Sequence, residues 1–450
     1  MQEKQFKKVL IANRGEIALR IIRSCKELGI STVAVHSEAD EHALFVKLAD
    51  ESVCIGPAKA SESYLLPQRI LSAAEITGAD AIHPGYGFLS ENAEFAKKVV
   101  SCGFSFIGPS PENIELMGDK LASREVMEKF GLQLLPSAVI SENELDQANK
   151  ELDRIGLPLI IKASAGGGGK GIKIVRAKDQ FFQTLKTAQA EAKAAFGDDR
   201  VYLERYLEEA RHIEIQVAAD QYGNVIHLGE RDCSIQRRYQ KVIEETPSPA
   251  VSPELRDQVG AIVVDAVKKL GYQSVGTVEF LMDAKKNFYF LEMNTRIQVE
   301  HPITEEVTNV DLVKLQIKLA QGQKMPLTQK DIQFVGHAIE FRINAEDAET
   351  FLPSCGQITE LHLPGGKGVR IDSGIYSGLK ITPYYDSMLA KLIVHGETRA
   401  EAIRKASASL HEFQVEGIKT NIPLHQKILV NKSFQNGDYH THFLNHFLQK

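Results

Sequence analysis

Strongly polar residues occupy every second position in one stretch of the second half of the sequence. They are Glu292, Asn294, Arg296, Gln298 and Glu300. Successive side chains of an extended strand point to opposite faces, so these five would share one face. Two carboxylates, a guanidinium and two amides on one face suit a metal and anion site. A solvent-facing antiparallel strand shows the same alternation, and this alternative stays open on the pattern alone.

The preceding segment favours the metal site over the solvated strand. The runs G-T-V-E-F-L-M-D and N-F-Y-F-L-E-M-N flank Ala284-Lys285-Lys286, which predicts a β-hairpin loop. A turn centred between Lys285 and Lys286 would place Glu279 directly opposite Glu292. Facing like charges are destabilising unless a cation lies between them. Mg²⁺ binds one or two carboxylates and keeps positions for phosphate, so the sequence predicts a magnesium site here.

Length and composition exclude several classes of protein. A chain of 450 residues indicates two to four domains, and its net charge of −6 argues against nucleic-acid binding. No apolar stretch approaches membrane-spanning length, and the N-terminus has no signal-peptide core. The cysteines are dispersed and lack C-x-x-C spacing, which indicates reduced thiols in a cytoplasmic protein. They are Cys25, Cys54, Cys102, Cys233 and Cys355.

The first hundred residues alternate between expected strands and helices. V-L-I-A-N, S-T-V-A-V-H and A-D-A-I-H are predicted strands, and residues 16–28 a predicted helix. This rhythm predicts a Rossmann-like parallel sheet in an α/β (α+β) protein. The run N-R-G-E-I-A has one glycine where a dinucleotide fingerprint needs three, so no NAD site is expected. The glycines of H-P-G-Y-G-F-L-S-E-N are compatible with a ligand loop or with a tight turn.

A glycine run forms the second informative stretch. Gly166 to Gly169 follow the predicted strand that ends at Lys162, and I-K-I-V after Gly171 favours another strand. Gly171 stands where a P-loop needs Ser or Thr, so the stretch is not a P-loop. Backbone N–H groups without side chains can wrap phosphate oxygens, which predicts a flap over a nucleotide. A surface loop is the alternative.

Several motifs, taken together and in order, carry a family resemblance. They are I-A-N-R-G-E-I-A, H-P-G-Y-G-F-L-S-E-N, M-G-D-K, the glycine run, R-H-I-E-I-Q-V, R-D-C-S-I-Q-R-R, E-M-N-T-R-I-Q-V-E-H-P and F-L-P-S-C-G-Q-I. Essentially the whole chain resembles the biotin carboxylase family of ATP-grasp enzymes. The resemblance implies an N-terminal Rossmann-like domain over residues 1–114, an ATP-grasp domain over 115–332 with a glycine-rich lid at about 136–205, and a C-terminal domain over 333–450.

The resemblance also implies roles for individual residues. Metal ions (Mg²⁺ or Mn²⁺) would be held by Glu279, Glu292 and Asn294. ATP would contact Lys120, Lys162, Gly168, Gly169, Glu204, Arg205, Leu207, His212, Gln236, Tyr239 and Leu281. Bicarbonate and biotin would contact Lys241, Arg296, Gln298, Val299, Glu300, Arg342 and Tyr86. Among these, Glu300, Arg296, Arg342 and Lys241 would be catalytic, with Glu300 as the general base. The sequence departs from the family at Tyr239, where histidine is common, and tyrosine cannot become cationic.

The implied activity is ATP-dependent carboxylation of biotin by bicarbonate through carboxyphosphate. The sequence has no M-K-M biotinylation motif, so we expect biotin on a separate carrier protein and carboxyl transfer on separate carboxyltransferase subunits. A homodimer is also expected, and acetyl-CoA carboxylase of fatty acid synthesis is the expected complex. Three other classes remain to be distinguished: an ATP-grasp ligase that joins an acid to an amine, a regulator that binds nucleotide without catalysis, and a structural protein of carboxylase assembly.

Overall fold

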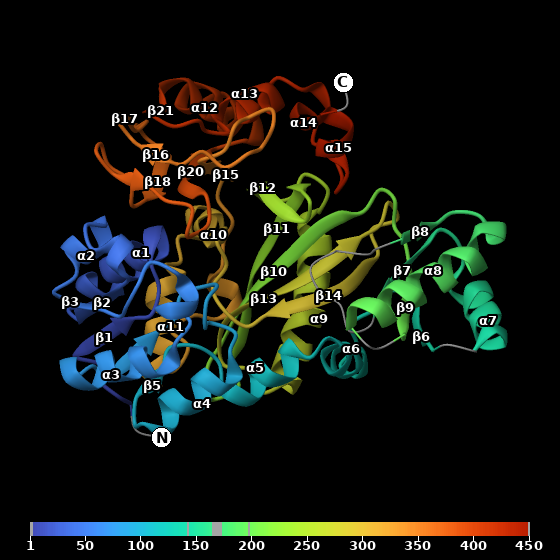
Figure 1. The fold of residues 1–450 in the computed structure, drawn as a ribbon, viewed down its shortest axis with the longest axis horizontal. Coiled ribbons are helices and arrows are strands. Elements are labelled where there is room, and N and C mark those ends of the chain that lie inside the picture. The colour runs from blue at the N-terminus through green and yellow to red at the C-terminus, as the bar shows by residue number, and fades with distance from the viewer. Residues whose placement is uncertain (1–2, 142–143, 164–172, 197–198, 449–450) are drawn as a thin grey trace.

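Three connected parts surround the predicted site in the computed structural model, which describes residues 3–141, 144–163, 173–196 and 199–448. In Figure 1 the N-terminal part lies to the left, a smaller lobe stands out to the right, and the C-terminal part lies across the top. The predicted α/β class is confirmed.

The N-terminal part is built on a parallel sheet of order β3-β2-β1-β4-β5, as the strand and helix rhythm predicts. Val9 and Ile11 face one hydrophobic core, and Leu10 and Ala12 face another on the opposite side. Burial of both faces explains why the strand sequence is apolar without alternation. The elements are β1 Lys8–Ile11, α1 Gly15–Glu27, β2 Ser31–His36, η1 Glu38–Asp40, α2 Leu44–Leu48, β3 Glu51–Cys54, η2 Ala60–Glu62, α3 Pro67–Thr77, β4 Ala81–His83, α4 Ala93–Ser101, β5 Ser105–Phe106, α5 Pro111–Gly118 and α6 Lys120–Lys129.

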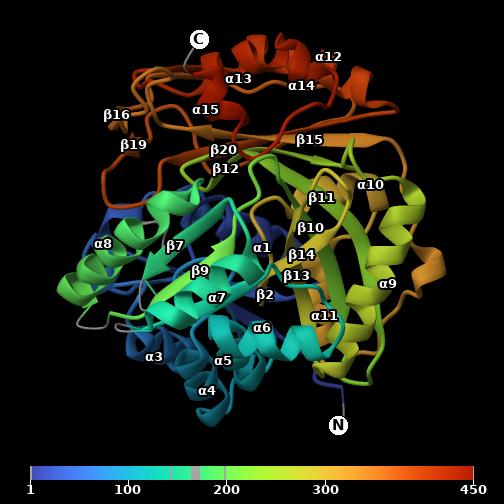
Figure 2. The same cartoon turned by 90° about the vertical axis from the view of Figure 1, so that its right-hand side faces the viewer.

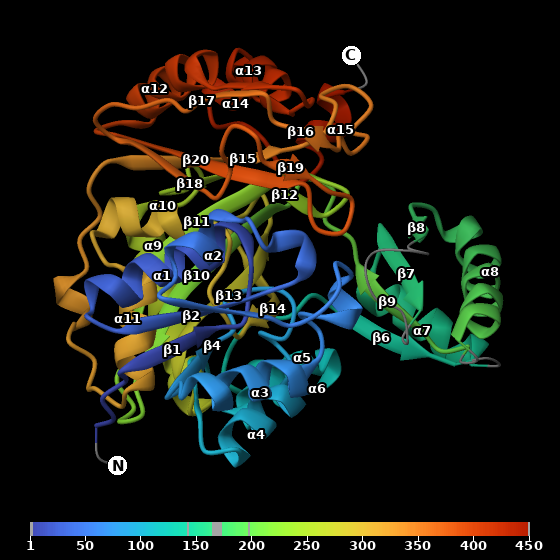
Figure 3. The ribbon, with the colours of Figure 1, turned by 60° about the vertical axis from the view of Figure 1, so that its left-hand side comes forward.

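The smaller lobe has a four-stranded antiparallel sheet with two helices packed on it, and Figure 3 shows it beside the main body. Its elements are β6 Ser137–Ile140, α7 Leu145–Ile155, β7 Leu159–Ala163, β8 Lys173–Val175, α8 Lys178–Phe196 and β9 Val201–Arg205. The two strands that flank the glycine run pair with each other, with Leu159 opposite Val175. The glycine loop itself, with Gly168 and Gly169, lies outside the described residues.

An eight-stranded antiparallel sheet of order β14-β13-β10-β11-β12-β15-β20-β18 forms the centre of the molecule. Its elements before residue 333 are β10 Arg211–Ala219, β11 Val225–Arg237, β12 Gln240–Thr246, α9 Pro253–Lys269, β13 Ser274–Met282, β14 Phe288–Asn294, α10 His301–Thr308, α11 Leu312–Ala320 and η3 Gln329–Asp331. Because β12 pairs with β15, the sheet continues into the C-terminal part (Figure 2). Residues from two predicted domains therefore share one sheet.

The C-terminal part adds three strands to this sheet and covers one face with helices. Its elements are β15 His337–Asn344, β16 Gly356–Gln357, β17 Glu360–His362, β18 Val369–Ser373, β19 Lys380–Ile381, β20 Met388–Gly396, α12 Arg399–Glu412, β21 Gln414–Glu416, α13 Ile422–Leu429, α14 Lys432–Gln435 and α15 Phe443–Phe447. In the described part of the chain, every helix is too short or too polar to span a bilayer. All five cysteines are unpaired thiols.

The predicted hairpin is confirmed, and Glu279 lies directly opposite Glu292 in β13 and β14. The longer strand that the alternation predicts is wrong beyond Asn294, where β14 ends. Glu300 is instead the residue before α10, whose first turn contains Pro302. Proline has a fixed φ that suits the first turn of a helix, so the chain turns into a helix here. The polar side chains still meet, but from a strand end, a loop and a helix start.

Candidate active site

A row of charged residues crosses four neighbouring strands of the central sheet. Glu292 lies opposite Glu279, Glu279 opposite Glu214, and Glu214 opposite Arg231. Directly opposed residues share a face of the sheet, so the row extends the predicted carboxylate pair toward the middle of the sheet. Glu214 and Arg231 are completely buried and form an ion pair. The charge of Glu214 is therefore neutralised by Arg231, whereas Glu279 and Glu292 are like charges that face each other across β13 and β14.

The Lys241 ammonium lies between three carboxylates from different elements. It is 2.6 Å from Glu214, 2.9 Å from Glu279 and 2.6 Å from Glu300. Burial acts to lower the pKa of Lys241, but the surrounding negative charge raises this pKa well above its ordinary value. Lys241 is thus a fixed positive charge at the centre of the site.

Glu300 is fully buried and is held by two cations. Besides Lys241, it accepts a hydrogen bond from Arg342 Nη2 at 3.0 Å. Burial opposes ionisation, yet Lys241, Arg342 and Arg231 hold the pKa of Glu300 far below its usual range. The Nε of Arg342 donates to Glu244 at 2.6 Å, so this guanidinium bridges two buried carboxylates.

Polar contacts to several other elements fix the loop between β14 and α10. Arg296 donates to Asn294 Oδ1 at 2.9 Å and to Glu91 at 2.9 Å. Gln298 donates to Glu279 at 2.9 Å, and the carbonyl of Val299 accepts from Lys391 at 2.9 Å. Gln298 and Glu300 therefore contact the Glu279 and Lys241 centre directly, and Glu292 faces Glu279 across the strand pair.

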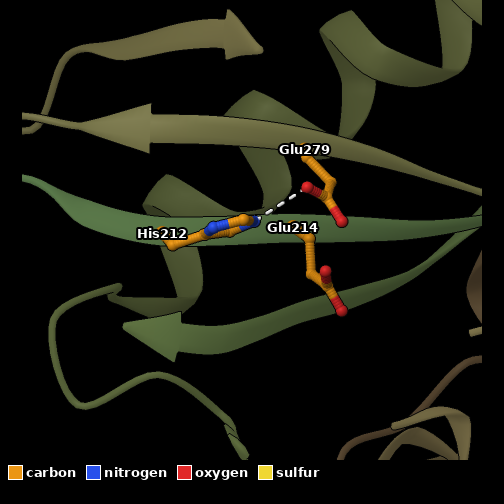
Figure 4. A group of neighbouring side chains, drawn as sticks. All are labelled: His212, Glu214 and Glu279. Carbon is orange, nitrogen blue, oxygen red and sulfur yellow. Dashed lines mark ion pairs between the residues drawn. The ribbon is translucent and has the colours of Figure 1, made fainter. Parts of the chain in front are cut away.

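His212 lies beside the charged row, as Figure 4 shows with Glu214 and Glu279. Its Nε2 is 3.0 Å from Glu279, and Gln236 contacts its Nδ1 at 3.1 Å. Burial lowers the pKa of His212, but the Glu279 charge more than offsets this and raises it. His212, Glu214 and Glu279 have possible ligand atoms within 4.8 Å of one another, as do Glu214, Cys233 and Glu300.

The predicted metal ligands fit a divalent cation of the magnesium type. Burial and the facing Glu279 charge raise the pKa of Glu292, because a carboxyl group beside another carboxylate is harder to ionise. The Glu292 carboxylate makes no hydrogen bond or ion pair to the residues that the structure describes. Oxygen donors from Glu279, Glu292 and Asn294 are the ligand type that Mg²⁺ prefers.

The predicted nucleotide residues that the structure describes lie in the smaller lobe, in α6 and in the strands of the central sheet. Lys162 and Arg124 both lie 3.1 Å from Glu204, so the lysine is paired within the lobe. Arg205 ends β9, Leu207 follows it, and Leu281 pairs with His212 across β10 and β13. Lys120 is exposed at the start of α6.

Tyr239 and Tyr86 differ in how they are placed. Arg238 and Tyr239 form the tip of the β11–β12 hairpin with φ of 50° and 66°, and Tyr239 is 71% exposed. Two left-handed residues match the type I′ turn that joins tightly twisted strands. Tyr86, by contrast, is half-buried, and its hydroxyl donates to Glu16.

Models of known families match three stretches of the chain. Residues 5–114 match the N-terminal domain of biotin carboxylase, residues 119–328 the ATP-binding domain of the carbamoyl-phosphate synthase L chain, and residues 340–446 the C-terminal domain of biotin carboxylase. The biotin carboxylase of Haemophilus influenzae is 55% identical over 98% of each chain. This chain belongs to the biotin carboxylase family.

Other relatives of this biotin carboxylase family member come from different carboxylases. A pyruvate carboxylase subunit of Methanothermobacter thermautotrophicus is 53% identical over 98% of this chain and 90% of its own. The biotin carboxylase domain of Hydrogenobacter thermophilus 2-oxoglutarate carboxylase, solved as a dimer with MgADP, ADP and bicarbonate, has a TM-score of 0.91 at 49% identity and covers 99% of this chain and 98% of that one. The biotin carboxylase of Campylobacter jejuni, in a complex named β-γ-ATP, has a TM-score of 0.92 at 46% identity, covering 98% and 99%.

The sequence-based set of site residues omits three carboxylates that contact predicted site residues in the structure. Glu214 alternates with apolar residues in R-H-I-E-I-Q-V, so its signal was as strong as that of Glu292. Glu91, at the end of the loop that contains Tyr86, contacts Arg296. Glu244 pairs with Arg342, but its neighbour in K-V-I-E-E-T is also glutamate, and the sequence does not distinguish which of the two faces the site.

Proposed function

We propose that this biotin carboxylase family member uses ATP to carboxylate biotin on a separate carrier protein, with bicarbonate as the carbon source. The observation that carries the proposal is the Lys241–Glu300–Arg342 cluster, which sets a buried carboxylate between two fixed cations. The family supplies the class of enzyme, and the bicarbonate and MgADP of the Hydrogenobacter thermophilus relative support the ligands.

The bicarbonate subsite consists of Lys241, Arg296, Gln298, Val299 and Glu300. Lys241 and Arg296 would balance the charge of the anion, and the Gln298 amide would orient it. Bicarbonate is a weak nucleophile, and Glu300 would remove its proton as its oxygen attacks the γ-phosphorus of ATP. This step forms the carboxyphosphate P–O bond, breaks the bond to ADP and leaves the proton on Glu300. A positioned base contributes on the order of 10²–10⁴-fold in rate.

The nucleotide subsite would combine the smaller lobe with the β10–β13 face. We assign phosphate binding to Lys120, Lys162 and the Gly168–Gly169 backbone, and adenosine binding to Glu204, Arg205, Leu207, His212, Gln236, Tyr239 and Leu281. Glu279, Glu292 and Asn294 would hold Mg²⁺, which when bound neutralises charge that develops on the phosphates. Since Lys162 is paired with Glu204 in this structure, ATP binding would exchange a carboxylate partner for a phosphate partner.

The biotin subsite consists of Arg342 and Tyr86 beside the bicarbonate subsite. Biotin becomes a nucleophile when its ureido N–H loses a proton, and negative charge then develops on the ureido oxygen. Arg342 has donors that would stabilise this charge. The nitrogen then forms a bond to the carboxyl carbon of carboxyphosphate, and inorganic phosphate leaves with the electron pair and takes up the proton that the ureido nitrogen lost. Closure of the lobe that bears the glycine run would keep water from carboxyphosphate.

The proposed complex is an acetyl-CoA carboxylase of fatty acid synthesis, with this chain as a homodimer beside a carrier protein and carboxyltransferase subunits. Several relatives are named biotin carboxylase with no acceptor given, and these names are compatible with this assignment. Pyruvate and 2-oxoglutarate are the two alternative acceptors, because other relatives belong to pyruvate carboxylase and 2-oxoglutarate carboxylase.

ADP release with Mg²⁺ and ATP tests the activity. We expect release to require bicarbonate and to rise with free biotin. Release that ignores biotin but follows an amine would indicate a different ATP-grasp ligase. Bound nucleotide without any release would indicate a regulator. The final acceptor is tested by supplying the carboxylated carrier and its carboxyltransferase with acetyl-CoA, pyruvate or 2-oxoglutarate.

A further inference from the structure

Lys391 is a completely buried lysine where the N-terminal part, the loop before α10 and the C-terminal part meet. It lies on β20, and its ammonium donates to the carbonyl of Val299 at 2.9 Å. Glu16 of α1 lies 3.1 Å from the same ammonium, and Asp372 of β18 lies 3.8 Å away. One side chain thus joins the N-terminal part, the loop before α10 and the C-terminal part.

The sheet register places Lys391 on the face that carries the active site. Arg342, Lys391 and Asp372 are directly opposed across β15, β20 and β18, so their side chains share a face. Arg342 is the residue that contacts Glu300. Lys391 is therefore the neighbour of a proposed biotin ligand, although the proposed mechanism gives it no role.

Burying a lysine completely is expensive unless its charge has partners, and lysine is among the residues least often buried. Burial lowers the pKa of Lys391, but Glu16, Glu340 and Asp372 together raise it, so the ammonium stays charged. Asp372 is shared with Arg370, which holds it through two nitrogens at 2.9 Å each. The carbonyl of Val299 is the neutral acceptor in this set.

The contact to Val299 fixes the backbone next to Glu300. His301 N donates to the carbonyl of Gln298 at 3.3 Å, and His301 Nδ1 lies 2.7 Å from the same oxygen. Residues 298–301 therefore form a tight turn, and Lys391 of β20 holds it through the carbonyl of Val299. A shift of this turn would move the Glu300 carboxylate and the Val299 backbone together.

A second branch leads from Lys391 to Tyr86. Glu16 accepts a hydrogen bond from the Tyr86 hydroxyl while its other oxygen faces Lys391. Glu16 and Tyr86 both belong to the N-terminal part, so this branch ties the proposed biotin contact to the C-terminal sheet. The two subsites thus share one buried cation.

We propose that Lys391 is a positioning residue for the carboxylation reaction, which holds the Val299–Glu300 turn directly and the Tyr86 hydroxyl through Glu16. This inference rests on the bicarbonate and biotin subsites proposed above. It predicts that replacing Lys391 lowers the efficiency of the reaction with bicarbonate and biotin but leaves the KM for ATP unchanged.

The test compares Lys391→Met with Lys405→Met in the full-length protein. Lys405 is a matched control, because it also donates to a backbone carbonyl, that of His395, in the same part of the molecule. For Lys391→Met we expect kcat/KM for bicarbonate to fall by on the order of 10²-fold, since small misplacements of reacting groups have effects of that size. The KM for ATP should stay within about twofold, as for loss of an interaction that the nucleotide does not use. Lys405→Met should behave as the wild type in both.

A second variant distinguishes loss of positioning from loss of folding stability. Lys391→Arg keeps the positive charge for Glu16 and Asp372, but its planar guanidinium cannot reproduce the single ammonium contact to Val299. We expect a melting temperature near that of the wild type and a reduced kcat/KM for bicarbonate. The proposal would be overturned if kcat/KM fell equally for ATP and bicarbonate, or if kcat/KM for bicarbonate were unchanged in either variant. Failure of both variants to unfold cooperatively would also overturn it. Absence of bicarbonate- and biotin-dependent turnover in the wild type would instead reject the proposed function itself.

Discussion

The Glu300 carboxylate lies 2.6 Å from the Lys241 ammonium, so the proposed base is ion-paired in the ligand-free site. A general base works best with a pKa near the working pH, and this pair holds the pKa of Glu300 far lower. A bicarbonate ion that binds Lys241 would take over part of its charge. The pKa of Glu300 would then rise when its substrate is present, which couples its basicity to binding.

Replacing Glu300 by glutamine should remove most bicarbonate-dependent turnover and leave nucleotide binding intact. The amide keeps the shape of the side chain but cannot accept the proton, so kcat should fall by on the order of 10²–10⁴-fold. Initial rates of ADP release and equilibrium binding of ADP measure the two quantities. Wild-type turnover in Glu300→Gln would remove this residue from the mechanism.

Arg342→Ala should impair carboxylation of biotin more than cleavage of ATP. The variant removes the donor proposed for the ureido oxygen, and loss of one such donor lowers the rate by on the order of 10²–10³-fold. Bicarbonate-dependent ADP release with and without biotin separates the two steps. Because Glu244 and Glu300 lose a cation in this variant, its melting curve must accompany the rates. Equal loss of both activities would place Arg342 at the nucleotide instead.

Glu292→Gln should raise the Mg²⁺ concentration needed for half-maximal rate by about tenfold or more, because it removes a charged oxygen ligand. Glu128→Gln, at an exposed position of α6, is the matched control and should leave the Mg²⁺ requirement unchanged. Titration of MgCl₂ at saturating ATP and bicarbonate measures the shift. The same requirement in Glu292→Gln and the wild type would exclude Glu292 as a ligand.

His425 should make the protein less stable in mild acid. Burial lowers its pKa from 6.5 to about 4 in the folded state, although its hydrogen bond to the carbonyl of Arg342 partly opposes the shift. As the pH falls below about 6.5, His425 is therefore protonated in the unfolded chain but stays neutral in the folded chain. This difference lowers the free energy of unfolding. The loss is absent above pH 6.5 and grows as the pH falls to about 4, at up to about 1.4 kcal/mol per pH unit.

Urea unfolding at pH 7 and pH 5 measures this effect. His425→Gln keeps a donor for the Arg342 carbonyl and has no group that titrates, so its stability should change less between the two pH values. An identical pH dependence in the wild type and the variant would contradict the assignment.

Local patterns were sufficient to predict the carboxylate hairpin, because a polar loop and two apolar strands fix its register. Glu279 faces Glu292 as the sequence predicts. The parallel N-terminal sheet and the strands around the glycine run follow from equally local signals. The sequence resemblance to the biotin carboxylase family agreed with the family models and relatives.

The partners of Lys241 and Lys391 could not be predicted in the same way. Lys241 contacts residues 27, 38 and 59 positions away, and Lys391 reaches Glu16 across most of the chain. Such contacts depend on how distant strands and helices pack, and a lysine in isolation resembles a solvated surface residue. The end of β14 at Asn294 was missed because a loop can place alternate polar side chains toward one site as a strand does.

The most direct test of the proposed activity is transfer of labelled carbon from bicarbonate to biotin. The protein would be incubated with Mg²⁺, ATP, free biotin and ¹⁴C-bicarbonate, and carboxybiotin and ADP would be measured together. We predict that labelled carboxybiotin forms only when ATP and bicarbonate are both present, and that Glu300→Gln forms almost none. ADP release without label on biotin, or equal labelling by the Glu300→Gln variant, would contradict the proposed chemistry of this site.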